Sequence, residues 1–363
     1  MYKMNDPSED VLQGYYERYA PEIRSLMQTL LDGTMISPKR SSVSYVRLKV
    51  KEDSATHRFL TKYVQDDNLR KLLCGTWQDL MDIVEEVRLT VPNMEWQKEM
   101  LKGQLDAGVY HIDCYDDKGH PRTDHFHDIL YWIFVKQMYD GENENTPFEK
   151  SIFVKERGLE VCPYCGREKI NMAEEEERTD SKPPIDHFLP KSKYPFLAMS
   201  YYNLIPCCTF CNELANKGDF DPLEFAPLIK KLLNPHEFED EAIRFSYAYN
   251  GNGDMSEKNF KIFTDTADNH LDEGYNHILK LRAFYAQETL QLKKIYLGFT
   301  KASDSMKKYL GNMGVEDDFL DNAMHMSLGY ELNDDEAPRT LFYKFRKEVF
   351  LQLLREYGYV YNE

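Results

Sequence analysis

No stretch of the sequence approaches the roughly 18 consecutive apolar residues that a membrane-spanning helix requires. The first ten residues, Met1–Asp10, lack the apolar segment of a secretory signal peptide, and no internal repeat is visible. These absences argue against a membrane protein, a secreted protein and a repeat architecture. We therefore expect a cytoplasmic protein that makes no contact with membranes.

Excess positive charge is also lacking. The chain has 45 Lys and Arg against 62 Asp and Glu, which gives a formal net charge of −17. Because phosphate binding usually relies on a basic surface, this balance argues against a protein that binds nucleic acid unaided. Either the chain has a local basic strip that its overall negative charge conceals, or a partner protein supplies the surface that holds the nucleic acid. We favour the partner.

Cysteine is scarce, and the number of cysteines, seven, is odd. Four of them form two Cys-x-x-Cys pairs, Cys162 with Cys165 and Cys208 with Cys211. In a reducing compartment such pairs indicate metal binding rather than disulfides, and two pairs complete the four-thiolate site that Zn²⁺ prefers. Buried cysteines without a metal are the alternative. Cys207 could replace Cys208, but only Cys208 has the two-residue spacing, so the four paired cysteines predict a structural zinc site.

The sequence does contain enough apolar material for a globular core, since 42% of its 363 residues are hydrophobic and 13% are aromatic. This length predicts two or three structural units. Residues 1–150 have mainly helical patterns, residues 151–236 are rich in loops and proline, and residues 237–363 combine a hairpin pattern with long helical ones. We predict an α+β fold in which a small middle domain is flanked by mainly helical regions.

Periodicity predicts individual elements within these regions. A capping box at Thr76 and Asp79 starts one helix. Alternating apolar residues on both sides of a turn at residues 250–253 predict a β-hairpin. Further helices are predicted over residues 124–138, 275–297 and 338–353, the last with Pro338 in its first turn.

Polar residues suited to metal binding and acid–base chemistry accompany the cysteine pairs. Asp186 and His187 are adjacent, Asn203 follows, and Asn212 comes directly after Cys211. Hydrolysis of a phosphodiester needs a base that activates water and a divalent cation that stabilises charge on the phosphate. A carboxylate suits the cation, and a histidine with an ordinary pKa of about 6.5 suits the base. Each residue alone has a structural explanation, such as a helix cap for Asn212 or a turn for Asn203, but their joint occurrence favours a catalytic site.

Residues 162–217, taken together, resemble the HNH or ββα-metal endonuclease module. The resemblance implies that His187 is the general base and that Asp186 is a ligand of the catalytic metal ion. It implies further that Asn203 braces the loop carrying the histidine and that Asn212, at the start of a helix, completes the metal site. Asn in place of His at this last position is a weaker, neutral ligand, which favours Mg²⁺ or Mn²⁺ over tightly held Zn²⁺.

Three lysines flank these residues and are candidates for contact with substrate phosphates, namely Lys191, Lys193 and Lys217. The alternative is that they are solvated surface lysines. Lys217 lies slightly further from Asn212 than the corresponding lysine in the shortest versions of the HNH motif.

The stretch from Asp186 to Pro195 also resembles HNH nucleases of bacterial antiphage systems such as the Septu type, in which the nuclease is paired with an ABC-family ATPase. This resemblance implies an effector nuclease that cuts DNA under the control of the ATPase, with the N- and C-terminal regions as docking surfaces. Two other functions stay open. One is an RNA endonuclease, acting for instance on tRNA, with the same site. The other is a zinc-stabilised adaptor whose HNH centre is not catalytic.

Overall fold

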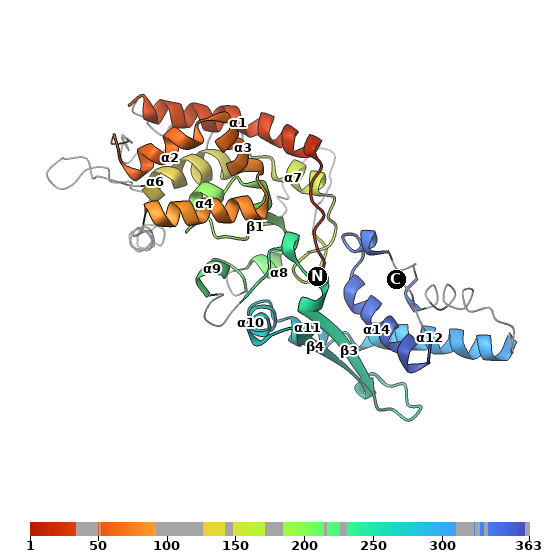
Figure 1. The fold of residues 1–363 in the computed structure, drawn as a ribbon. Coiled ribbons are helices and arrows are strands. Elements are labelled where there is room, and N and C mark those ends of the chain that lie inside the picture. Colours follow the sequence, from red (N-terminus) through yellow and green to blue (C-terminus); the bar gives the residue numbers. More distant parts are fainter. Residues whose placement is uncertain are drawn as a thin grey trace, which may run out of the picture.

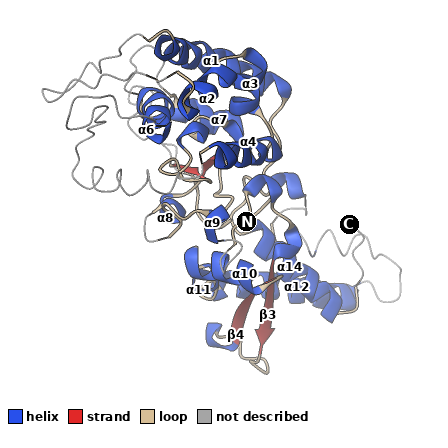
Figure 2. Ribbon diagram, turned by 60° about the vertical axis from the view of Figure 1, so that its left-hand side comes forward, coloured by secondary structure: helices blue, strands red, loops and turns tan. Residues whose placement is uncertain are grey.

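The computed structural model of the chain describes residues 1–33, 50, 52–91, 126–141, 148–170, 184–213, 216–225, 231–309, 323, 327–329 and 333–359. Helices predominate in this part of the chain, which also contains two antiparallel two-stranded sheets, so the fold belongs to the α+β class that the sequence predicts. None of the helices in the described ranges combines the length and the apolar character that crossing a membrane requires. Figures 1 and 2 show the N-terminal helices at one end of the molecule and the longer hairpin with the C-terminal helices at the other.

The N-terminal helices bury apolar faces in a common core. Helix α4 (Trp77–Thr90) starts where the sequence predicts. The Thr76 hydroxyl accepts a hydrogen bond from the Asp79 amide, and the Asp79 carboxylate accepts one from the Thr76 amide. This capping box satisfies amides at the start of the helix that have no partner within it. The helices α1 (Glu9–Leu31), α2 (Ala55–Tyr63) and α3 (Asp66–Cys74) lie at this end with α4.

The segment from Phe126 to Tyr139 is helical, as predicted, but most of it is a π-helix. Helix α6 (Phe126–Leu130) continues into the π-helix η1 (Tyr131–Tyr139), whose side chains are almost all buried. π-Helical turns are rare and often occur at functional sites. Here the π-helix ends at Tyr139, whose ring meets that of His187 with centroids 4.3 Å apart. The first two residues of the predicted helix, Asp124 and His125, lie outside the described residues.

The middle region of the chain contains a short antiparallel pair of strands. Strand β1 (Ile185–His187) pairs with β2 (Leu204–Pro206), with His187 opposite Leu204. Strand β2 leads into the short helix α8 (Thr209–Asn212). Two further helices belong to this region, α7 (Lys150–Arg157) before the strands and α9 (Pro222–Phe225) after them.

A β-hairpin opens the C-terminal region, as predicted. Strands β3 (Ile243–Tyr249) and β4 (Phe260–Thr266) pair antiparallel along their whole length. The turn between them contains Asn252 and Gly253, both at positive φ, a conformation that these two residue types adopt most readily. Alternate side chains of both strands are buried, and helix α12 (Thr289–Tyr309) packs against β4.

Helix α14 (Tyr343–Glu356) covers the outer edge of β3. The Gln352 side chain accepts a hydrogen bond from the Tyr247 amide and donates one to the Tyr247 carbonyl, both at 3.1 Å, as a neighbouring strand would. The Glu348 carboxylate accepts a hydrogen bond from the Phe245 amide. Because an uncovered strand edge can pair with another chain, these contacts protect the hairpin against such pairing.

Two helix predictions in the C-terminal region are wrong. The continuous helix predicted over residues 275–297 is interrupted at Lys280, whose φ of +56° is not compatible with a helix interior. The helix predicted to start with Pro338 begins only at Tyr343. Phe342 before it has a φ of +60°, and its amide donates a hydrogen bond to the Gly166 carbonyl (2.6 Å). Residues 275–297 instead belong to the π-helix η7 (Glu273–Ile278), to α11 (Leu281–Tyr285) and to the start of α12, and the short helix α10 (Asn269–Asp272) precedes them.

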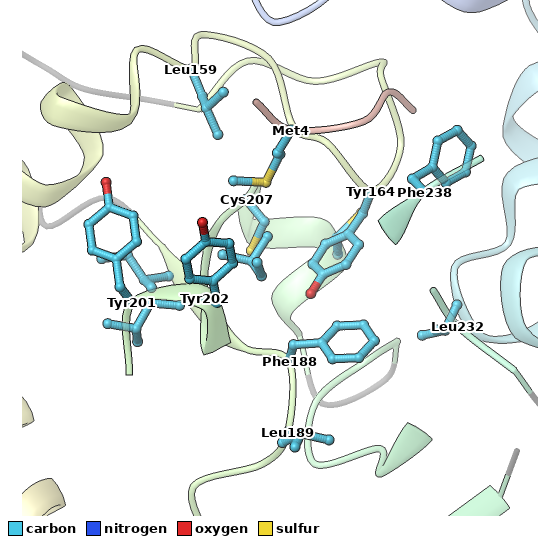
Figure 3. Close-up of a cluster of buried hydrophobic side chains, with 14 of the residues drawn as sticks. Met4, Leu159, Tyr164, Phe188, Leu189, Tyr201, Tyr202, Cys207, Leu232 and Phe238 are labelled. Carbon is cyan, nitrogen blue, oxygen red and sulfur yellow. The ribbon is translucent and has the colours of Figure 1, made fainter. Parts of the chain in front are cut away.

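Residues 1–8 run from α1 to the centre of the molecule (Figure 1). Met4 is buried there, and its amide donates a hydrogen bond to the Pro235 carbonyl (2.9 Å). Figure 3 shows the Met4 side chain within an apolar cluster that also contains Leu159 and Phe238. The first residues of the chain therefore join the core of the middle region to the N-terminal helices.

His236, also buried in this centre, makes stability depend on pH. Its Nε2 accepts a hydrogen bond from Arg157 (2.6 Å), and the exposed Asp6 carboxylate lies 3.3 Å from Nδ1. Burial, followed by the charges of Arg157 and Lys3, lowers the pKa of His236 from 6.5 to about 2. Below pH 6.5 the unfolded chain binds a proton at this residue and the folded chain does not. The free energy of unfolding should therefore decrease as the pH is lowered, by about 1.4 kcal/mol for each pH unit well below 6.5.

The variant His236→Gln, which keeps an acceptor for Arg157, should remove this contribution. Urea unfolding of both proteins between about pH 7 and pH 5 gives the free energy of unfolding as a function of pH. The carboxylates titrate alike in the two proteins, so the difference between the two slopes is the contribution of His236. Parallel stability curves would contradict the prediction.

Candidate functional site

The four paired cysteines come together, as their spacing predicts. The Sγ atoms of Cys162, Cys165, Cys208 and Cys211 lie within 4.8 Å of one another, and all four side chains are buried. Four sulfur ligands about 2.3 Å from a tetrahedral Zn²⁺ are about 3.8 Å apart, and Cys165 Sγ lies 3.9 Å from Cys208 Sγ. This four-cysteine group could hold a metal ion such as zinc. Cys207, although buried, is not part of it.

Local structure shapes both halves of the four-cysteine group. After the first pair, Gly166 has a φ of +62°, and its amide donates a hydrogen bond to the Cys162 carbonyl (2.8 Å), which closes the turn. In the second pair Cys208 caps helix α8, and its Sγ accepts a hydrogen bond from the Cys211 amide (3.5 Å). Burial raises the pKa of the Cys162 thiol well above its ordinary range. Burial therefore disfavours the thiolate form of Cys162, and a bound cation would favour it.

Both halves of the four-cysteine group converge on Asp186. From the first half, the Tyr164 hydroxyl donates a hydrogen bond to Asp186 Oδ2 (2.5 Å). Beyond the second half, Lys217 Nζ lies 3.0 Å from Asp186 Oδ1, 2.9 Å from Oδ2 and 3.0 Å from the His187 carbonyl. The Lys217 amide also donates a hydrogen bond to the Cys211 carbonyl (3.3 Å). The cysteine group and the Asp186–His187 pair thus form one connected unit.

The buried ion pair predicts a large effect of Lys217 on stability. Lys217→Met leaves the Asp186 carboxylate buried without its cation, so the free energy of unfolding should fall by about 3–5 kcal/mol. Lys62→Met is the matched control, because Lys62 pairs with Glu86 at the surface, where both side chains are 43% exposed. Such a pair contributes about 1 kcal/mol or less.

Urea unfolding measures both variants, and adding Asp186→Asn to Lys217→Met should recover part of the loss, because the buried charge is then removed. Equal effects of the Lys217 and Lys62 variants would refute the stabilising role of the buried pair.

His187 lies at the end of β1 with its ring oriented by two contacts. Nε2 is 3.1 Å from the Ala198 carbonyl, so Nε2 carries the proton and Nδ1 keeps its lone pair. The ring meets the Tyr139 ring edge-on, with centroids 4.3 Å apart. Burial, and after it the positive charge of Lys191, lowers the pKa of His187 well below its ordinary value of 6.5. The imidazole is therefore neutral at pH 7 and able to accept a proton.

Asn203 binds the loop that follows His187. Its Nδ2 donates hydrogen bonds to the Leu189 and Leu197 carbonyls, both at 3.1 Å, and its Oδ1 accepts one from the Leu189 amide (2.8 Å). The side chain is fully buried. The Asn203 carbonyl also accepts a hydrogen bond from the Phe188 amide (2.9 Å). These contacts fix the backbone at Leu189 and Leu197, in the loop that follows His187.

A pocket of about 340 Å³ lies beside Asp186 and His187. Asp186 and His187 line it together with Asn212 from the end of α8, which is partly exposed. The fold thus brings three of the four predicted catalytic residues to one pocket, while Asn203 lies behind it in the core. The other polar and charged lining residues are Tyr139, Lys150, Lys191 and Asp219.

The three candidate phosphate lysines differ in environment. Lys191 lines the pocket, and its side chain is 30% exposed. Lys193 does not line the pocket and pairs with the buried carboxylate of Asp221 (3.1 Å). Lys217 is buried in its pair with Asp186. Among the three, Lys191 is thus the one in a position to meet a substrate in the pocket.

Reasoning from sequence missed three residues of the site. Tyr164 lies between Cys162 and Cys165, and this position inside a ligand pair was the available signal. Tyr139 ends the π-helix and Lys150 begins α7. Neither belongs to a motif, and no sequence pattern connects them with Asp186 and His187.

Comparisons with protein-family models, with curated proteins and with solved structures found no match to this chain. Function is therefore inferred from the motif and from the geometry of the residues that carry it.

Proposed function

We propose that this chain is a metal-dependent HNH endonuclease that hydrolyses phosphodiester bonds in DNA. One observation carries the proposal: His187, with Nε2 bound to a backbone carbonyl and Nδ1 free to accept a proton, shares a pocket with Asp186 and Asn212. The order of strand β1, strand β2 and helix α8, with a four-cysteine group joined to Asp186, also supports it. This is the order of elements that a ββα-metal module requires.

In the proposed mechanism His187 is the general base. Its neutral imidazole takes a proton from water at Nδ1, while the hydrogen bond from Nε2 to Ala198 keeps the ring oriented. The water oxygen then attacks phosphorus as the bond from phosphorus to the leaving oxygen breaks. Asn203 holds the loop next to the histidine, so the base is positioned before the substrate arrives.

Asp186 and Asn212 would hold Mg²⁺ or Mn²⁺ through oxygen atoms, the donors that these cations prefer. An ionised carboxylate offers about four lone-pair sites. Lys217 and Tyr164 use part of this capacity, which leaves Asp186 able to bind a cation through one oxygen. The donors present therefore fit a weakly held metal ion. When bound, the ion would stabilise negative charge on the phosphate and on the leaving oxygen.

We further propose that the nuclease acts in an antiphage complex with an ABC-family ATPase. The net charge of −17 supports a partner, because an acidic protein attracts a polyanion poorly unless basic surface is supplied from elsewhere. The partner would hold the nucleic acid and control access to the pocket around His187.

Cleavage by the purified protein tests the proposed function. We expect cutting of plasmid DNA that requires Mg²⁺ or Mn²⁺ and that increases when the protein encoded by the adjacent gene is added. Parallel reactions with single-stranded DNA and total tRNA distinguish a DNA endonuclease from an RNA endonuclease. Folded, zinc-loaded protein that cuts none of these substrates, alone or with the neighbour, would instead support a non-catalytic adaptor.

A further inference from the structure

The residues around the reactive pocket also indicate how the substrate backbone is held. Tyr139 is buried, and three contacts fix its ring. Its hydroxyl donates a hydrogen bond to the Ile185 carbonyl (3.3 Å), its ring stacks on Phe148 with centroids 5.2 Å apart, and the ring meets that of His187 at 4.3 Å. The aromatic face therefore has a defined position next to the proposed base.

Two lysines from different elements meet this ring. Nζ of Lys150, the first residue of α7, lies 4.3 Å from the ring centroid of Tyr139. Nζ of Lys191, in the loop after β1, lies 4.6 Å from the same centroid. Attraction between an ammonium group and the electron-rich face of an aromatic ring favours these positions. Both lysines line the pocket that contains His187, so the ring gathers two cations beside the reactive imidazole.

We propose that Lys150 and Lys191, positioned by Tyr139, bind the phosphodiester backbone next to the scissile bond. This inference rests on the proposed nuclease function and names the contact by which a chain of net charge −17 can still engage a polyanion. Ammonium groups bind phosphate oxygens without reading base sequence. The site therefore holds the substrate in place and contributes no sequence preference.

The ion pair between Lys191 and Asp140 (3.0 Å) is compatible with this role. Both side chains are partly exposed, at 30% and 28%, and such a pair contributes about 1 kcal/mol or less. Asp140 also pairs with Lys136 (3.1 Å). It therefore keeps a cation when Lys191 turns toward a phosphate.

Binding, rather than cleavage, provides the test. Full-length His187→Ala protein is titrated into a short fluorescein-labelled DNA duplex without added Mg²⁺, and fluorescence anisotropy gives Kd over a series of salt concentrations. Lys150→Gln and Lys191→Gln, each added to that variant, should weaken binding several-fold and equally for duplexes of different sequence. Each should lower the slope of log Kd against log salt by about 1, and the double variant by about 2. A labelled RNA strand in the same titration identifies which backbone binds more tightly.

One lysine provides a matched control. Lys155 lies on the same helix as Lys150 and is exposed, but it does not line the pocket. Lys155→Gln should leave the salt slope unchanged. An unchanged slope in the Lys150 and Lys191 variants, or no saturable binding of DNA or RNA even at low salt, would overturn the site.

The site and the nuclease can fail separately. Metal-dependent cleavage with an unchanged slope would reject the backbone site and keep the nuclease. A reduced slope without any cleavage would keep the site and reject the nuclease.

Discussion

Replacing His187 by alanine should lower the rate of metal-dependent cleavage by about 10²–10⁴-fold, the usual contribution of a general base, while the protein stays folded. The structural cost is small. The ring donates one hydrogen bond to Ala198 and makes one edge contact with Tyr139, and each contributes about 1 kcal/mol. Single-turnover cleavage of plasmid DNA and thermal unfolding of the same preparation measure the two effects.

A second buried histidine provides the matched control for this prediction. Nε2 of His127 lies 2.7 Å from the Ser192 carbonyl, much as that of His187 lies near Ala198, but His127 does not line the pocket. His127→Ala should lose similar stability and keep most of the cleavage rate. His187→Gln should be as inactive as the alanine variant, because its amide can donate to Ala198 but cannot take a proton from water. A soluble His187→Ala protein that cuts at the parent rate would remove His187 as the base.

Disrupting the four-cysteine group should have the largest effect on stability. Structural zinc contributes about 10–16 kcal/mol to the folding of small zinc-binding peptides, more than a single side-chain contact provides. Cys208→Ala should therefore lose the metal and most of the cooperative unfolding transition of the middle region. Cleavage should end as well, because Tyr164 and Lys217 orient Asp186 from the two halves of the group. Elemental analysis for zinc and near-ultraviolet circular dichroism provide the measurements.

Replacing the neighbouring Cys207 distinguishes the effect of losing the metal from the effect of losing a buried thiol. Cys207 is fully buried but lies outside the four-cysteine group. Cys207→Ala should retain one zinc per chain and a cooperative transition. Equal zinc content in the Cys207 and Cys208 variants would show that the group is not the metal site.

Local patterns in the sequence predicted local structure well. Cys-x-x-Cys spacing places two thiols on one side of a tight turn, and the structure brings both pairs together. The capping box at Thr76 and Asp79 and the turn at residues 250–253 are likewise interactions between near neighbours, and both predictions are confirmed. Such features depend on backbone geometry over a few residues, and the residue types at those few positions determine that geometry.

The wrong predictions fall where a distant contact overrides a local pattern. Apolar periodicity continues through Lys280 and Phe342, yet both residues have positive φ. At Phe342 the cause is visible, because its amide binds the Gly166 carbonyl and its ring meets that of Tyr285. Periodicity records which residues are apolar and contains no information on where the chain must turn to reach a partner.

By itself, the sequence determined the α+β class, the four-cysteine group and the gathering of Asp186, His187 and the two asparagines within one short region. Only the tertiary structure decided which groups meet Asp186 and His187. It buried the Lys217 ammonium against Asp186, and it brought Tyr139 and Lys150 to the pocket beside His187. The physical reason is that these contacts depend on how the π-helix, α7 and the strands pack together, and that packing joins residues far apart in the chain that no local pattern relates.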